Sequence, residues 1–224
     1  MITIAPSTEA ASLVRSFTIV ETDTETSRIL LPDTGAVLGI RYAGSAALIE
    51  RGKATVLPNV TLAGMRNTVS QIRTSAGGGI IVANFRENGA RAVFELPMYQ
   101  LFNDMIGSND LTWPEELEQL RSTVASASDS LTRAHTIERF LLTHKSPRVR
   151  DTTVAAAVRA MRFARGAISI RSLACSLGLS QDRFEKRFRQ EVGASPKHQS
   201  HFIREFRAVT GESPRKFLRG VDYC

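Results

Sequence analysis

Residues Ile170–Lys197 read IRSLACSLGLSQDRFEKRFRQEVGASPK, and their pattern predicts the architecture of the C-terminal part of the chain. The small residue Ala174, a turn at Gly178 and a helix cap at Ser180 together form the pattern of a helix-turn-helix. In such a pair the first helix lies across the phosphate backbone of DNA and the second enters the major groove. The side chains expected to pack on the opposite, inward side are Phe184, Phe188, Leu173, Leu177 and Leu179.

Part of this stretch is repeated 18 residues further along the chain. The pattern F-x-x-x-F-R-x-x-x-G-x-S-P-[KR] begins at Phe184 and begins again at Phe202. Each copy predicts a short basic amphipathic helix with two phenylalanines one turn apart, ended by a glycine and followed by a Ser-Pro restart. Two basic helices of this kind in one region favour nucleic-acid binding.

The excess positive charge of the chain lies in its C-terminal part. Residues 148–224 contain 16 Lys and Arg against 7 Asp and Glu, whereas residues 1–147 contain 13 against 15. This asymmetry is typical of a nucleic-acid-binding module attached to a neutral domain, although a solvated basic surface is the alternative. We therefore divide the chain at Pro147 into domains 1–147 and 148–224.

The composition is that of an ordinary globular protein, with 42% apolar and 23% charged residues. No apolar run approaches the roughly 20 residues that cross a bilayer, and the first residues lack the pattern of a signal peptide. We expect a cytoplasmic protein without a membrane partner. The two cysteines, Cys175 and Cys224, do not suggest a disulfide framework, and Cys175 is expected to be a buried thiol within a helix.

The N-terminal domain is expected to contain many short strands. Segments rich in β-branched and aromatic residues alternate with turn signals such as Asn88-Gly89, which suggests an antiparallel sheet or a small barrel. The predicted strands are 37–42, 46–49, 54–57, 67–72 and 80–85, within a region from about Phe17 to Phe94 that reads as strands.

Helices are expected to follow these strands. Apolar residues from Met98 to Ile106 recur at helical spacing, Pro114 suits a first helical turn, and Asp129 and Asp151 are predicted helix caps. The fold class is therefore α+β: an antiparallel β-rich domain with trailing helices, followed by an all-α helix-turn-helix domain.

The β-rich part lacks the residues that catalysis needs. All four histidines follow the predicted strands, and no cysteine precedes Cys175. A metal site in this part would therefore have no ligands except carboxylates, and a nucleophile would have no histidine as its base. The glycines from Gly77 to Gly79 are not followed by the Lys-Ser/Thr of a phosphate loop and predict a hairpin turn. We expect no enzyme, no metal and no cofactor. Four arginines of this part could serve an anionic ligand, although a solvated face is the favoured interpretation: Arg41, Arg66, Arg73 and Arg86.

The C-terminal residues resemble a known family. Ile170–Lys197 is similar to the first helix-turn-helix of the AraC/XylS family of bacterial transcription regulators, and QSHFIREFRAVTGESPRKF, from Gln199 to Phe217, resembles the recognition helix and closing motif of the second. The N-terminal segments RILLPDTG, ANFRENGA and FELP resemble one branch of the family more loosely. The resemblance implies a regulator that binds double-stranded DNA and carries an N-terminal sensor or dimerisation domain. A small-molecule effector, RNA polymerase and a second copy of the chain are the further partners that it implies.

The chain departs from the family pattern near His198. Family members carry a linker helix and a supporting helix before the second recognition helix, which corresponds to roughly 30 residues here. Recognition helices in successive major grooves lie about 34 Å apart, whereas the seven residue steps from Val192 to Gln199 span at most about 25 Å. We hypothesise that a segment is missing from the sequence at this point. If the deletion is genuine instead, we expect weakened or absent operator binding.

The candidate DNA contacts fall into two groups. The base-reading candidates are Gln181, Asp182, Arg183 and Lys186 in the first motif and Gln199, Ser200, His201 and Arg204 in the second; for His201 a helix surface without contact is an equal alternative. The phosphate-binding candidates are Arg171, Arg189, Arg207, Arg215 and Lys216. Two alternatives remain: an interaction regulator with little DNA affinity, and a DNA-repair enzyme, against which the lack of clustered cysteines argues.

Overall fold

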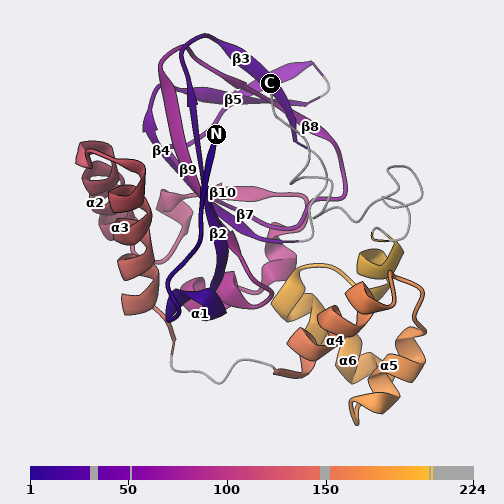
Figure 1. Cartoon of the computed structure of the whole chain (residues 1–224). Coiled ribbons are helices and arrows are strands. Elements are labelled where there is room, and N and C mark those ends of the chain that lie inside the picture. The colour runs from indigo at the N-terminus through magenta and orange to yellow at the C-terminus, as the bar shows by residue number, and fades with distance from the viewer. Residues whose placement is uncertain (31–34, 51, 147–151, 202, 204–224) are drawn as a thin grey trace.

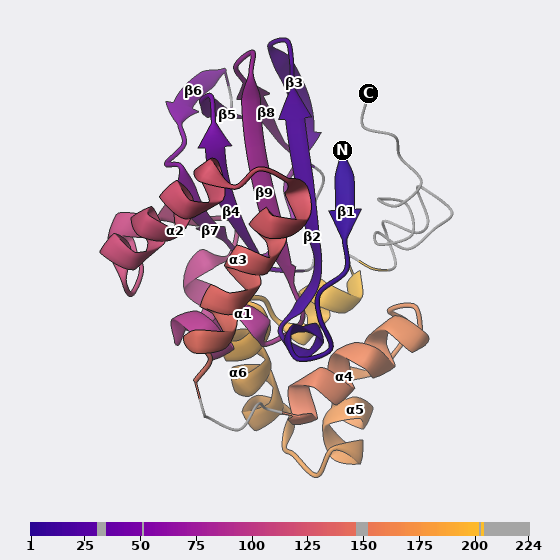
Figure 2. The same ribbon diagram turned by 60° about the vertical axis from the view of Figure 1, so that its left-hand side comes forward.

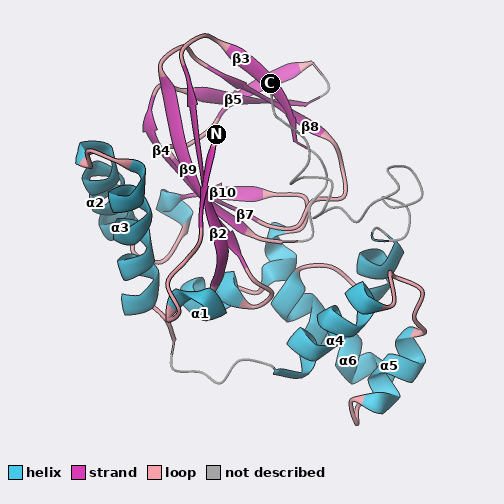
Figure 3. Cartoon of the chain, viewed as in Figure 1, coloured by secondary structure: helices cyan, strands magenta, loops and turns pink. Residues whose placement is uncertain are grey.

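The computed structural model describes residues 1–30, 35–50, 52–146, 152–201 and 203. Strands occupy the N-terminal part and helices the C-terminal part, which confirms the α+β class (Figure 3). The helices are α1 (Gly89–Phe94), α2 (Pro114–Ser126), α3 (Ser130–Thr143), α4 (Thr152–Phe163), α5 (Ile170–Ser176) and α6 (Gln181–Val192), and the short 3-10 helices are η1 (Ala10–Ser12), η2 (Met98–Leu101) and η3 (Ser108–Asp110).

The strands form two antiparallel sheets. The larger sheet has the order β1 (Ile2–Ile4), β2 (Val14–Thr22), β9 (Gly78–Phe85), β4 (Val37–Ala43), β7 (Val60–Ala63) and β10 (Met105–Gly107). The smaller sheet has the order β3 (Thr26–Leu30), β8 (Ser70–Thr74), β5 (Ala46–Glu50) and β6 (Lys53–Val56). Each of the five predicted strands is present, although β8 begins three residues later than the predicted segment 67–72.

The main core lies between one face of the larger sheet and the helices α2 and α3, which cross that face in Figure 2. Along β4, Leu38 and Ile40 are fully buried, as alternation in a strand requires for one face. Leu117 and Val124 of α2 meet this face at helical spacing. Helices α2 and α3 therefore close the core of the β-rich part of the chain.

Two N-terminal predictions need correction. The segment Met98–Ile106 is not one helix, because only η2 is helical and Met105 and Ile106 pair with β7 as an edge strand. A short apolar run fits a helix and a strand equally well, because it is too short to show which of the two periodicities it follows. The segment after Asn88 forms helix α1 instead of a strand, and a Cβ at Gly89 would lie 2.1 Å from the Leu13 carbonyl oxygen.

Asp129 caps α3 as predicted, and its side chain accepts hydrogen bonds from the backbone N–H groups of Leu131 and Thr132. The Thr132 hydroxyl, followed by these amides, lowers the pKa of Asp129 from 3.8 to about 2. Because the folded pKa is depressed, the cap contributes fully above pH 3.8 and is lost as the pH falls through about 2. We expect the amide NMR shifts of Leu131 and Thr132 to titrate with a midpoint near 2, and Asp129→Asn to keep the cap without this titration. A midpoint at the ordinary Asp value would contradict the prediction.

Candidate nucleic-acid interface

Helices α5 and α6 form the predicted helix-turn-helix (Figure 1). The hydroxyl of Ser169 accepts from the Ser172 amide, and that of Ser180 accepts from the Arg183 amide, so each helix is capped by a serine. Gly178 lies in the turn with φ +68°, in the left-handed region that glycine enters without steric cost. The turn at Gly178 and the cap at Ser180 were predicted from the sequence, whereas the cap at Ser169 was not.

The inward face of α6 closes the core of the module. Phe184 and Phe188 are fully buried, and their rings meet edge to face with centroids 5.6 Å apart. Leu173 of α5 and Val158 of α4 belong to the same buried cluster. This packing fixes which face of α6 remains outside.

The outward face of α6 carries the first group of candidates. Gln181, Asp182, Arg183 and Lys186 are all exposed, and the Gln181 amide donates to Glu185 at 2.9 Å. They occupy the first turns of α6, which is the end of a recognition helix that approaches base edges. Two phosphate candidates, Arg171 on α5 and Arg189 near the end of α6, are exposed as well.

The second group is not arranged in the same way. Gln199 and Ser200 are 0% and 7% exposed in this structure, and their base-reading role stays a prediction. His201 is exposed. The candidates Arg204, Arg207, Arg215 and Lys216 lie outside the described residues, as do Phe202, Phe206 and the predicted cap Asp151.

The chain runs directly from the first motif into the second. Gly193 ends α6 with φ +102°, and residues 196–201 are helical, with the Ser195 hydroxyl accepting from the His198 amide. The Gln199 amide donates to the Ser195 carbonyl at 3.1 Å, so Lys197 and Gln199 lie within one helical turn. The domain boundary at 147 and the shortened second motif stay predictions.

Cys175 is exposed on α5, not buried. Leu173 and Ala174 take the inward side of this helix, and each further residue rotates the side chain by about 100°, which places the thiol towards solvent.

Among the residues that the structure describes, no group of three or more His, Cys, Asp or Glu could hold a metal ion, and no helix is long and apolar enough to cross a membrane.

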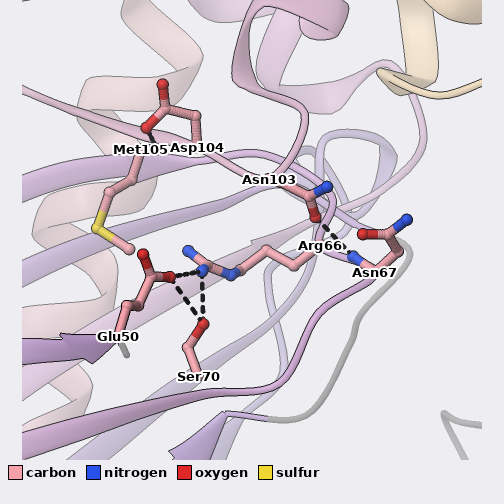
Figure 4. Close-up of polar contacts among 7 residues, drawn as sticks. All are labelled: Glu50, Arg66, Asn67, Ser70, Asn103, Asp104 and Met105. Atoms are coloured by element: carbon pink, nitrogen blue, oxygen red, sulfur yellow. Dashed lines mark hydrogen bonds and ion pairs between the residues drawn. The ribbon is translucent and has the colours of Figure 1, made fainter. Parts of the chain in front are cut away.

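Two of the N-terminal arginines are buried, contrary to the expected solvated face. Arg66 donates through one nitrogen to Glu50 and to Ser70, each at 2.6 Å (Figure 4). Arg41 is 4% exposed, and this burial lowers the pKa of its guanidinium. Arg73 and Arg86 are exposed. Burial of the first two depends on how the strands and their connecting segments pack, which strand periodicity alone does not decide.

Sequence reasoning missed the residues that join the two halves of the chain. Glu87 and Arg91, next to and within α1, form ion pairs with Arg162 of α4 and Glu191 of α6. No motif marks these residues, because each partner lies far away in the sequence.

No protein-family model and no curated protein matches the chain. The apo form of a ToxT variant from Vibrio cholerae is 10% identical, with a TM-score of 0.37 over 89% of this chain and 99% of that chain. Wild-type ToxT with bound unsaturated fatty acid is 10% identical, with a TM-score of 0.36 over 82% and 94%. The AraC-like transcriptional activator CuxR is 13% identical, with a TM-score of 0.37 over 98% and 90%. Each of these likenesses extends over most of this chain, at low identity and a low TM-score.

Proposed function

We propose that the chain is a sequence-specific DNA-binding transcription regulator of the AraC/XylS type. The observation that carries the proposal is α6, which buries Phe184 and Phe188 on one side and exposes Arg183 and Lys186 on the other. The helix is capped, follows a tight turn and belongs to the positively charged part of the chain. Cationic side chains bind phosphates on any sequence, whereas polar side chains at the start of the helix read base edges.

A gel shift on random duplex DNA over a range of salt concentrations tests this proposal. A DNA-binding module that neutralises phosphates loses affinity steeply as salt rises, because counterions are no longer released into dilute solution. Absence of binding at low salt, or a flat salt dependence, would favour the interaction regulator with little DNA affinity. The burial of Gln199 and Ser200 is the observation that favours that second candidate.

Arg171→Ala is expected to weaken binding to all duplexes alike and to reduce the slope of log affinity against log salt by about 1. The reason is that Arg171 lies exposed on α5, the helix that crosses the backbone in a helix-turn-helix. Arg139→Ala, at an exposed position on α3, is the matched control with the same change in charge. An unchanged slope for Arg171→Ala, or an equal effect at Arg139, would contradict the phosphate role.

The N-terminal domain is proposed to control the module, through an effector or a partner that changes how α5 and α6 meet DNA or RNA polymerase. Its support is the direct contact between the domains through α1 and α6. As a bacterial DNA-binding regulator the protein would act in the cytoplasm. The repair-enzyme alternative has its own test: because Cys175 is exposed, incubation with alkylated DNA would add mass to it if it accepted alkyl groups.

A further inference from the structure

An aromatic side chain stands in solvent at the end of α4. Phe163 is the last residue of this helix and is 92% exposed. Arg159, one turn earlier on the same side of the helix, is exposed as well. Val158 and Met161 take the buried side of α4. A phenylalanine in water forgoes the free energy that its burial would contribute, so the packing of the described residues does not account for Phe163.

The backbone directly after Phe163 adopts a conformation that an arginine rarely takes. The Gly166 amide donates to the Met161 carbonyl at 2.9 Å and the Arg165 amide donates to the Arg162 carbonyl at 3.1 Å, which is the hydrogen-bond pattern of a Schellman motif. Glycine usually occupies the left-handed position of this motif. Here that position is Arg165, with φ +55°, although a glycine follows directly. A side chain in the left-handed region costs free energy, so the arginine is kept at the expense of local stability.

The side chain of Arg165 does not repay this cost within the part of the chain that the structure describes. Arginines at helix ends often bind the last carbonyl groups, but Arg165 is exposed and no hydrogen bond or ion pair joins its guanidinium to another residue there. The sequence from Arg159 to Arg171 contains four arginines and no Asp or Glu. The surface formed by Arg159, Phe163 and Arg165, called here the α4–α5 corner, is therefore cationic and carries an exposed ring.

This corner occupies a defined place in the helix-turn-helix module. Helices α4, α5 and α6 share one buried cluster, so the module is a three-helix unit in which α6 is the third helix (Figure 1). In homeodomains, which are three-helix units of this kind, the connection between the first and second helices contacts the DNA backbone while the third helix reads the major groove. Arg165 lies in the corresponding connection, between α4 and the cap of α5 at Ser169.

We infer that the α4–α5 corner is a further DNA contact, in which Arg165 binds a phosphate and Phe163 packs against the sugars of the same strand. The charge of the corner complements duplex DNA, and the strand that borders the major groove at α6 also borders a minor groove. Proteins that contact the minor-groove side combine arginines with apolar side chains such as phenylalanine. The inference rests on the proposed DNA-binding function and adds a contact outside α5 and α6.

Arg165→Gly separates a DNA contact from a structural role. Glycine suits the left-handed position, so the midpoint of urea unfolding should not fall. Affinity for duplex DNA should fall on all sequences, and the slope of log affinity against log salt should decrease by about 1. Arg165→Lys keeps the charge and should keep this slope. Arg139→Ala, at an exposed position on α3, is the control that removes a charge away from the corner.

Phe163→Ala tests the apolar part of the contact. We expect affinity for duplex DNA to fall by about fivefold, because part of the ring is buried only in the complex. The salt slope should stay unchanged, since no charge is lost. Leu131→Ala is the matched control: Leu131 is 51% exposed on α3, and its removal should leave DNA affinity unchanged.

Hydroxyl-radical footprinting, which reports on the sugars, locates the contact. On a selected operator, Phe163→Ala should lose protection at one end of the site and keep it where α6 binds. If Phe163→Ala and Arg165→Gly bind DNA with the original affinity and slope, the inference is overturned while the proposed function stands. A parallel loss of affinity and of stability in Arg165→Gly would give this residue a structural role and would overturn the inference as well. If the original chain does not bind duplex DNA at low salt, the proposed function and the inference fail together.

Discussion

Phe188→Ala is expected to lower the free energy of unfolding of the helix-turn-helix module by about 3 to 5 kcal/mol, the usual cost of removing a buried phenylalanine. Phe188 is 0% exposed, meets Phe184 edge to face and faces the cluster that α4, α5 and α6 share. Alanine would leave a cavity in a core that is small and has few residues able to fill it. Because a domain is stable by only about 5 to 15 kcal/mol, this loss removes a large share of the module's stability.

The control for this variant is Phe163→Ala, in the same module. Phe163 is 92% exposed, so its removal should change stability by no more than about 0.5 kcal/mol. Urea unfolding followed by circular dichroism reports on the helices, whereas the fluorescence of Trp113, the single tryptophan, reports on the core of the N-terminal domain. Equal losses for the two variants would contradict the assignment of Phe188 to the core.

Lys186→Ala is expected to lower affinity for the preferred operator by about 1 to 3 kcal/mol, or about 5- to 150-fold, while binding to random duplex falls much less. Lys186 is exposed on the outward face of α6, one turn after Asp182 and Arg183. Its ammonium can donate to the O6 and N7 acceptors of guanine, so the preference at one operator position should relax. The operator would first be obtained by selection from a random library.

Sequence preference, not affinity alone, decides the role of Lys186. Selection repeated with Lys186→Ala should yield sites that are degenerate at one position, whereas selection with Arg171→Ala should yield the original site at lower affinity. If the preference of Lys186→Ala is unchanged, the residue touches phosphate or solvent and its base-reading role is wrong.

The first motif could be predicted because each of its parts is a local signal. Ser169 and Ser180 cap through amides three residues ahead, and Gly178 takes a conformation that depends on its own lack of a side chain. Phe184 and Phe188 share a face because four residues make about one helical turn. None of these relations needs a distant partner.

The errors arose where burial depends on the rest of the chain. Cys175 is exposed, although it lies in the helix that the sequence predicts. Arg41 lies in β4 and Arg66 in the connection between β7 and β8, and only the packing of the N-terminal part shows that they are enclosed. Residue type predicts burial poorly for polar residues, since they are enclosed only where specific neighbours cover them.

By itself the sequence determined the α+β class, the helix-turn-helix and the polar, basic face of α6, because these follow from periodicity, capping and turn residues within about one or two helical turns. Tertiary structure alone decided that Arg91 meets Glu191, which lies 100 residues away, and that Gln199 and Ser200 are buried. Contacts between distant residues depend on how whole elements pack, and no local pattern records that packing.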